Sequence, residues 1–118
     1  MNLADLQAYL LAKEGATADT PFGPDVLVYK VRNKVFALVA WNANPLHISL
    51  KCRPTHALAL RAEYKAVKPG YHLNKEHWNT VTLDGSIALP VIEAMIDESY
   101  TLVVRGLSKR VQQQLGVE

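Results

Sequence analysis

The chain has 118 residues, of which 49% are hydrophobic and 20% charged, and its net charge is +2. This length and balance fit a single domain, residues 1–118, and exclude a disordered tail, a collagen-like fibre and a membrane protein. The charge is unevenly spread, because residues 30–77 contain nine Lys or Arg against two acidic residues while both flanking segments are mildly acidic. The single cysteine cannot form an internal disulfide and the N-terminal residues lack a signal-peptide pattern, so we expect a cytoplasmic protein.

The first half of the chain is predicted to form one helix and three strands. Residues 2–13 have apolar side chains three and four positions apart, the spacing of an amphipathic helix that Asn2 can cap. Residues 16–24 are rich in turn-forming residues. Apolar and alternating segments over 26–32, 35–41 and 46–52 then predict three consecutive strands, which short turns join into an antiparallel meander.

The second half is predicted to be mainly helical. Pro54 opens a helix rich in Ala and Leu, and a short strand over 80–83 follows the break at Pro69-Gly70. Pro90 begins a helix with a broad apolar stripe, and Ser108 caps a last short helix. The order α-β-β-β-α-β-α-α predicts an α+β domain with helices packed on one face of an antiparallel sheet.

The most distinctive part of the sequence is rich in histidine and aromatic residues: Pro69-Gly70-Tyr71-His72-Leu73-Asn74-Lys75-Glu76-His77-Trp78-Asn79-Thr80-Val81. Together with Phe22-Gly23-Pro24, Ile48-Ser49-Leu50-Lys51-Cys52 and Ser99-Tyr100, it resembles the MmcQ/YjbR family of small bacterial proteins. The resemblance covers nearly the whole chain and departs at Thr101, where the family often has Asp. It implies a compact α+β fold similar to type III secretion chaperones, and it implies DNA binding, the function customarily given for the family.

The basic middle of the chain provides candidate DNA contacts. If the first and third strands turn their apolar sides inward, several basic and polar side chains project together from the other face of the sheet. The residues expected to contact phosphates are Lys30, Arg32, His47, Lys51, Arg53, Lys65, Lys68 and Lys75. Because no helix carries a cluster of base-reading residues, such binding would depend little on sequence. The alternative is an ordinary solvated face.

The His-rich and aromatic segment permits a second hypothesis. A non-enzymatic adaptor or small-ligand-binding protein could use it to line a groove, through Tyr71, His72, Asn74, Lys75, His77 and Trp78. The alternative is that these residues only order a loop. A homodimer, formed through a sheet edge or the wide apolar stripe of the helix after Pro90, is a further hypothesis, and its alternative is that this helix is central to the core of a monomer.

Neither catalysis nor a cofactor is expected from the sequence. His72 and His77 are five residues apart and have no cysteine nearby, so we expect no metal site. Cys52 has the strand parity of Ile48 and Leu50 and should point into the core, while His47 has the opposite parity and cannot serve as its base. No catalytic residue is therefore assigned.

Overall fold

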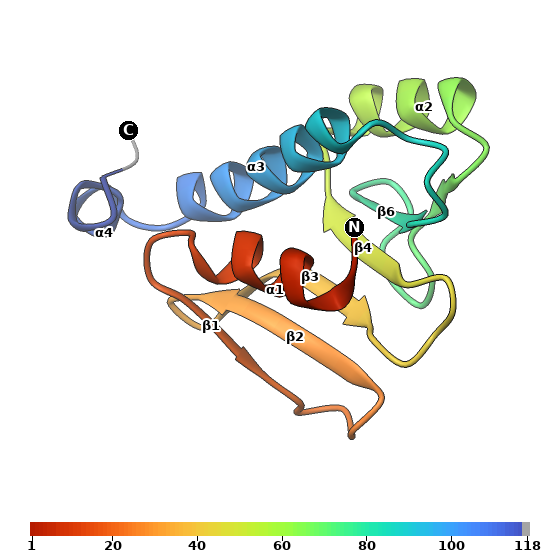
Figure 1. The fold of residues 1–118 in the computed structure, drawn as a ribbon. Helices are drawn as coiled ribbons and strands as arrows, with labels where there is room; N and C mark the ends of the chain where they lie inside the picture. Colours follow the sequence, from red (N-terminus) through yellow and green to blue (C-terminus); the bar gives the residue numbers. More distant parts are fainter. Residues whose placement is uncertain (117–118) are drawn as a thin grey trace.

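The computed structural model describes residues 1–116 and contains a six-stranded sheet with four helices (Figure 1). In chain order the elements are α1 (Leu3–Leu11), β1 (Ala16–Asp19), β2 (Val26–Val31), β3 (Lys34–Ala40), β4 (His47–Lys51), α2 (Pro54–Glu63), β5 (Val67–Pro69), β6 (Trp78–Thr82), α3 (Leu89–Arg105) and α4 (Lys109–Gln114). The predicted α+β class is confirmed.

The strands are ordered β1-β2-β3-β4-β6-β5, and every neighbouring pair is antiparallel. The predicted meander, β2-β3-β4, lies in the middle of the sheet. The two edge strands were not predicted, because β1 is Ala-Thr-Ala-Asp and β5 is three residues that include Pro69, compositions with low β-propensity. Short, polar or proline-containing strands are typical of sheet edges, where they discourage pairing with a second molecule.

The helices α1 and α3 lie on one side of the sheet (Figure 1). Their buried side chains, including Leu6, Leu10 and Ile96, form one core with the residues of alternate strand positions such as Val39 and Ile48. Asn2 caps α1 as predicted, since its side-chain oxygen accepts a hydrogen bond of 2.8 Å from the Asp5 N–H.

A buried serine connects α3 to the centre of the sheet. The register between β2 and β3 shifts at Tyr29/Lys30, which leaves Phe36 outside the regular pairing. The Ser99 hydroxyl donates a hydrogen bond of 2.5 Å to the Phe36 carbonyl oxygen and accepts one of 2.8 Å from the Lys51 N–H. Both backbone groups are therefore satisfied where the ladder is irregular.

The hairpin between β2 and β3 turns on Arg32-Asn33, whose φ angles are +47° and +69°. Two positive φ values suit the right-handed twist of a two-residue hairpin. The strand predicted over 26–32 therefore ends one residue early, and Arg32 lies in the turn. Within residues 1–116, no helix has the length and apolar character needed to cross a membrane.

Candidate functional site

The face of the sheet opposite α1 and α3 has its own row of side chains. Pairing across the strands aligns Val28, Leu38, Ser49 and Thr80 in one row, and the next row contains Val26, Ala40, His47 and Thr82. These positions alternate with the core positions, so they point to the opposite side. We call this side the open face.

A groove of about 850 Å³ lies over the open face. Its floor is apolar at Leu38 and Ala40 and polar at Ser49 and Thr80, whose hydroxyl oxygens are 2.8 Å apart and hydrogen-bonded. A volume of this size, with mostly apolar walls and a few polar groups, is typical of sites for organic ligands. We call this volume the open-face groove.

Two aromatic side chains line the open-face groove from separate loops. Phe22 precedes β2 and is 71% exposed, while Tyr71 follows β5 and is 73% exposed. The ring of Tyr71 lies against the ring of His72, with their centroids 4.0 Å apart. Because both exposed rings line the same apolar groove rather than lying singly on the surface, the two loops form the strongest candidate binding surface.

The loop between β5 and β6 is held in place by specific contacts. The Tyr71 N–H donates to the Thr80 hydroxyl at 3.0 Å, which attaches the start of the loop to the floor of the groove. Gly70 is needed because a Cβ there would lie 2.7 Å from the Cβ of Trp78. Arg61 reaches the loop from α2, where its Nε donates a hydrogen bond of 2.6 Å to the Asn79 side-chain oxygen and its guanidinium also donates to the Lys75 carbonyl.

The His-rich and aromatic segment divides into two groups. Tyr71 and His72 line the open-face groove. The others order the loop. The Asn74 side chain accepts a hydrogen bond of 2.9 Å from the Glu76 N–H, and the His77 carbonyl accepts one of 2.8 Å from the Cys52 N–H. Lys75 Nζ lies 3.4 Å from the Gly70 carbonyl oxygen, and the half-buried Trp78 is paired with Lys51 in the sheet.

The structure brings together four of the eight basic residues singled out in the sequence. Lys30, His47 and Lys51 occupy open-face positions by their register, and Lys68 lines the open-face groove from β5. The Lys30 ammonium lies 3.5 Å from the Asp19 carboxylate, a surface ion pair. The remaining positive charge of the open face is therefore carried by Lys51 and Lys68.

The other four basic residues lie elsewhere. Arg32 does not project from the open face, because the positive φ of the turn directs its guanidinium to the Gln114 side-chain oxygen at 3.1 Å, next to α3. Arg53 is beside Glu98, with Nε 3.7 Å from Oε2. Lys65 is exposed between α2 and β5, and Lys75 is on the outer loop. The predicted basic surface is thus only partly continuous.

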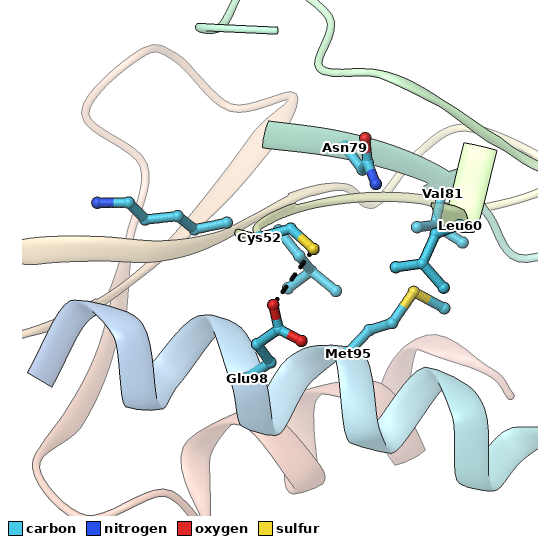
Figure 2. A pocket seen from close by; sticks show the side chains of 8 residues that line it. Cys52, Leu60, Asn79, Val81, Met95 and Glu98 are labelled. Carbon is cyan, nitrogen blue, oxygen red and sulfur yellow. Dashed lines mark hydrogen bonds between the residues drawn. The ribbon is translucent and has the colours of Figure 1, made fainter. Parts of the chain in front are cut away.

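A second cluster of chemically active side chains lies where β4 ends and α2 begins. The Cys52 thiol donates to Glu98 Oε2 at 3.3 Å, and the His56 ring nitrogen Nδ1 is 2.6 Å from Glu98 Oε1. Figure 2 shows Cys52 and Glu98 directed toward each other. Both also line a cavity of about 10 Å³, which is room for about one water molecule. Cys52 is buried as predicted.

The protonation of this cluster follows from its surroundings. Burial, followed by the hydrogen bond to the Glu98 carboxylate, raises the pKa of the Cys52 thiol to about 12. Burial alone would raise the pKa of the Glu98 carboxyl, but the hydrogen bonds it accepts lower that pKa overall. The cluster therefore holds a neutral thiol beside a carboxylate, which is not the arrangement of a nucleophilic cysteine.

No sequence motif connects these three residues. Cys52 and His56 are separated by three positions across a strand-to-helix junction, and Glu98 is on α3. The spacing of Cys52 and His56 could have indicated a metal site, since a cysteine and a histidine four residues apart can bind the same metal ion. Only the packing of α3 against the sheet supplies the carboxylate.

The comparison with protein families agrees with this fold. A family model described as YjbR matches residues 11–102. The chain belongs to the YjbR family. The resemblance inferred from the sequence is therefore confirmed.

Related chains and solved structures extend the match to almost the full length. The YjbR protein of Escherichia coli K12, itself described as uncharacterized, is 36% identical over 115 residues, or 98% of both chains. The uncharacterized protein YbdF of Escherichia coli O157:H7 is 38% identical over 95 residues, covering 80% of this chain and 78% of YbdF.

A crystal structure of DR2400 from Deinococcus radiodurans, a DUF419 domain, matches 99% of this chain and 89% of its own with a TM-score of 0.93 and 33% identity. A Pseudomonas syringae protein matches 87% of this chain and 99% of its own, with a TM-score of 0.75 and 30% identity. These two solved structures thus share the overall fold on which the open-face groove is built.

Proposed function

We propose that this protein is a non-enzymatic binding protein whose open-face groove holds an organic anion with an apolar or aromatic body. The observation that carries the proposal is the groove itself, about 850 Å³ of space over the sheet face opposite α1 and α3. Its walls include two strongly exposed aromatic side chains, Phe22 and Tyr71. Apolar lining with a few polar groups is the usual composition of a site for an organic ligand.

The charge of the lining indicates the sign of the ligand. The titratable side chains that line the described groove are His47, His72, Lys68 and Tyr71, with no carboxylate among them. Lys68 contributes a positive charge at the β5 side, and the hydroxyl pair of Ser49 and Thr80 offers hydrogen bonds at the floor. An anionic group is therefore favoured near β5, with the apolar body extending toward Leu38 and Phe22.

The proposal is tested with naphthalene-1-sulfonate as the probe and neutral naphthalene derivatives as comparisons. Backbone amide chemical shifts are followed by NMR as the probe is added. We expect the shifts of β3, β4 and the loop after β5 to change along titration curves that fit a single dissociation constant. Phe22→Ala should weaken binding about tenfold, since an exposed aromatic contact contributes about 1.4 kcal/mol. Leu58→Ala is the matched control, because Leu58 is a 63% exposed apolar residue on α2.

Charge reversal separates the role of the anion from that of the apolar body. Lys68→Glu should weaken the sulfonate about fivefold and leave the neutral compound unaffected, whereas Lys109→Glu on α4 should change neither. Shifts spread evenly over the protein, or equal affinities for the charged and the neutral compound, would contradict the proposal.

DNA binding is the second candidate function. It is supported by the common orientation of Lys30, Lys51 and Lys68 on the open face and by the customary description of the family. Exposed Phe22 and Tyr71 could stack on unpaired bases, which favours single strands over duplex. The cytoplasmic location and the homodimer inferred from the sequence accompany either function as predictions.

Labelled single-stranded and duplex DNA, titrated by fluorescence anisotropy at several salt concentrations, distinguish this candidate. Phosphate contacts require an affinity that falls steeply as salt rises. The double variant Lys30→Glu with Lys51→Glu should abolish that binding, whereas Lys109→Glu with Arg110→Glu on α4 should reduce it little. Absent or salt-independent binding at low ionic strength rejects DNA and leaves the small-anion proposal untouched.

A further inference from the structure

Cys52, His56 and Glu98 come from three different parts of the fold and meet at one point. Cys52 follows β4, His56 is in the first turn of α2, and Glu98 is in the middle of α3. One potential ligand atom from each lies within 4.8 Å of the other two. We propose that these three side chains bind a divalent cation of the zinc class, with Cys52 coordinating as the thiolate.

The donor set matches the preferences of zinc. Sulfur, imidazole nitrogen and carboxylate oxygen bind zinc at about 2.3, 2.0 and 2.1 Å, so tetrahedral ligands lie about 3.3–3.6 Å apart. The Cys52 Sγ to Glu98 Oε2 distance is already 3.3 Å. His56 Nδ1 is 2.6 Å from Glu98 Oε1, so a small rotation of the ring is required to admit the ion.

The site is also accessible and has support around it. The His56 side chain is 39% exposed, which leaves an entry path and room for a water in the fourth position. The backbone N–H of Arg53 donates to Glu98 Oε2 at 3.2 Å, a contact of the kind that orients metal-binding carboxylates. The Arg53 guanidinium beside Glu98 is 67% exposed and can move into solvent when the cation enters.

Charge and proton balance can be stated for the binding step. The neutral thiol and the divalent ion give a thiolate–metal bond and release one proton. Neutral His56 loses the proton on Nδ1 to solvent and gains one on Nε2, so it coordinates through Nδ1 with no net change of charge. Thiolate and carboxylate together neutralise the double charge of the ion. The ion thus replaces the hydrogens that now join Cys52 and His56 to Glu98, and no oxidant or reductant is involved.

Cobalt(II) titration of the full chain, followed by absorption, tests the proposal. We expect one equivalent of Co²⁺ to produce a thiolate-to-cobalt charge-transfer band and strong visible bands of a tetrahedral site, both removed by one equivalent of Zn²⁺. Cys52→Ser should abolish the charge-transfer band, and His56→Gln and Glu98→Gln should each weaken Zn²⁺ binding about 100-fold. Calorimetry in two buffers should show about one proton released per ion.

His47→Gln and His72→Gln are the control variants, because both histidines lie on the open face outside the cluster. Circular dichroism establishes whether each variant is folded. If Cys52→Ser does not fold, the His56→Gln variant still tests the site, because His56 is more exposed than Cys52. Wild-type protein without the charge-transfer band, or Zn²⁺ affinity that follows His47 and His72 instead, would overturn the proposal. Binding at the cluster does not depend on the proposed function of the open-face groove.

Discussion

Replacing Tyr29 with Phe is expected to stabilise the protein. Tyr29 is on β2, its side chain is 0% exposed, and its hydroxyl has no hydrogen-bond partner among residues 1–116. Burial raises the pKa of this phenol, so the hydroxyl is buried in its neutral form. The folded protein therefore bears the desolvation cost of a hydroxyl that forms no hydrogen bond in return.

The size of the effect follows from two opposing terms. An unsatisfied buried polar group costs about 1–3 kcal/mol, and losing the contacts of one oxygen atom costs about 1 kcal/mol or less. Tyr29→Phe should therefore raise the free energy of unfolding by about 1 kcal/mol. For a chain of 118 residues the unfolding entropy is about 0.25 kcal/mol/K, so the melting temperature should rise by about 4 °C.

Urea denaturation and thermal denaturation both measure this change, and the m-value should stay constant. Tyr100→Phe is the matched control, since the Tyr100 hydroxyl donates a hydrogen bond of 2.5 Å to the Glu14 carbonyl oxygen and its loss should destabilise by about 1 kcal/mol. If Tyr29→Phe destabilised the protein as much as Tyr100→Phe does, the Tyr29 hydroxyl must have a partner, and the reasoning would fail.

Three other changes test the contacts around the sheet. Arg61→Ala removes the hydrogen bonds to Asn79 and to the loop after β5, so urea denaturation should show a loss of about 2 kcal/mol and amide exchange should quicken in that loop. Gly70→Ala places a Cβ against β6 at 2.7 Å and should cost about 1–3 kcal/mol in thermal denaturation; unchanged stability would mean that the loop can shift freely. Burial, then the hydrogen bond to Asp97, raises the pKa of Tyr9 to about 12 from an unfolded value of 10. Stability should therefore fall as the pH rises from 10 to 12, and Tyr9→Phe should reduce that slope.

Local physical chemistry explains which parts of the fold could be predicted. The central strands are alternating or apolar throughout, and each helix begins with a capping side chain (α1, α4) or a proline in its first turn (α2, α3), so each expresses its structure within a few residues. β1 and β5 do not, because their strand conformation comes from pairing with β2 and β6 rather than from their own composition. Arg32 was misplaced because alternation in β2 was extended into a turn whose φ angles no alternation reveals.

The candidate sites differ in the same way. Strand parity correctly placed Lys30, His47 and Lys51 on one face, since parity is a local property. The sequence predicted a groove lined by Tyr71 and His72 but not its place, because that depends on α1 and α3 covering the other face of the sheet and on Phe22 lining the same groove from a separate loop. No sequence pattern pairs Glu98 with Cys52, and only the packing of α3 places its carboxylate beside the end of β4.

The two proposed sites use opposite parities of the same strand. His47 and Ser49 point from β4 into the open-face groove, whereas Cys52, just past the end of β4, points to Glu98 on the helix-covered side. The groove residues and the cluster residues have no hydrogen bond in common, so changes in one should add to changes in the other. Because a β-strand separates its alternate side chains to opposite faces, one short segment can supply residues to two independent sites. Loading with Zn²⁺ should accordingly leave the affinity of the groove for an organic anion unchanged, and a coupled response would mean that β4 itself moves between two positions.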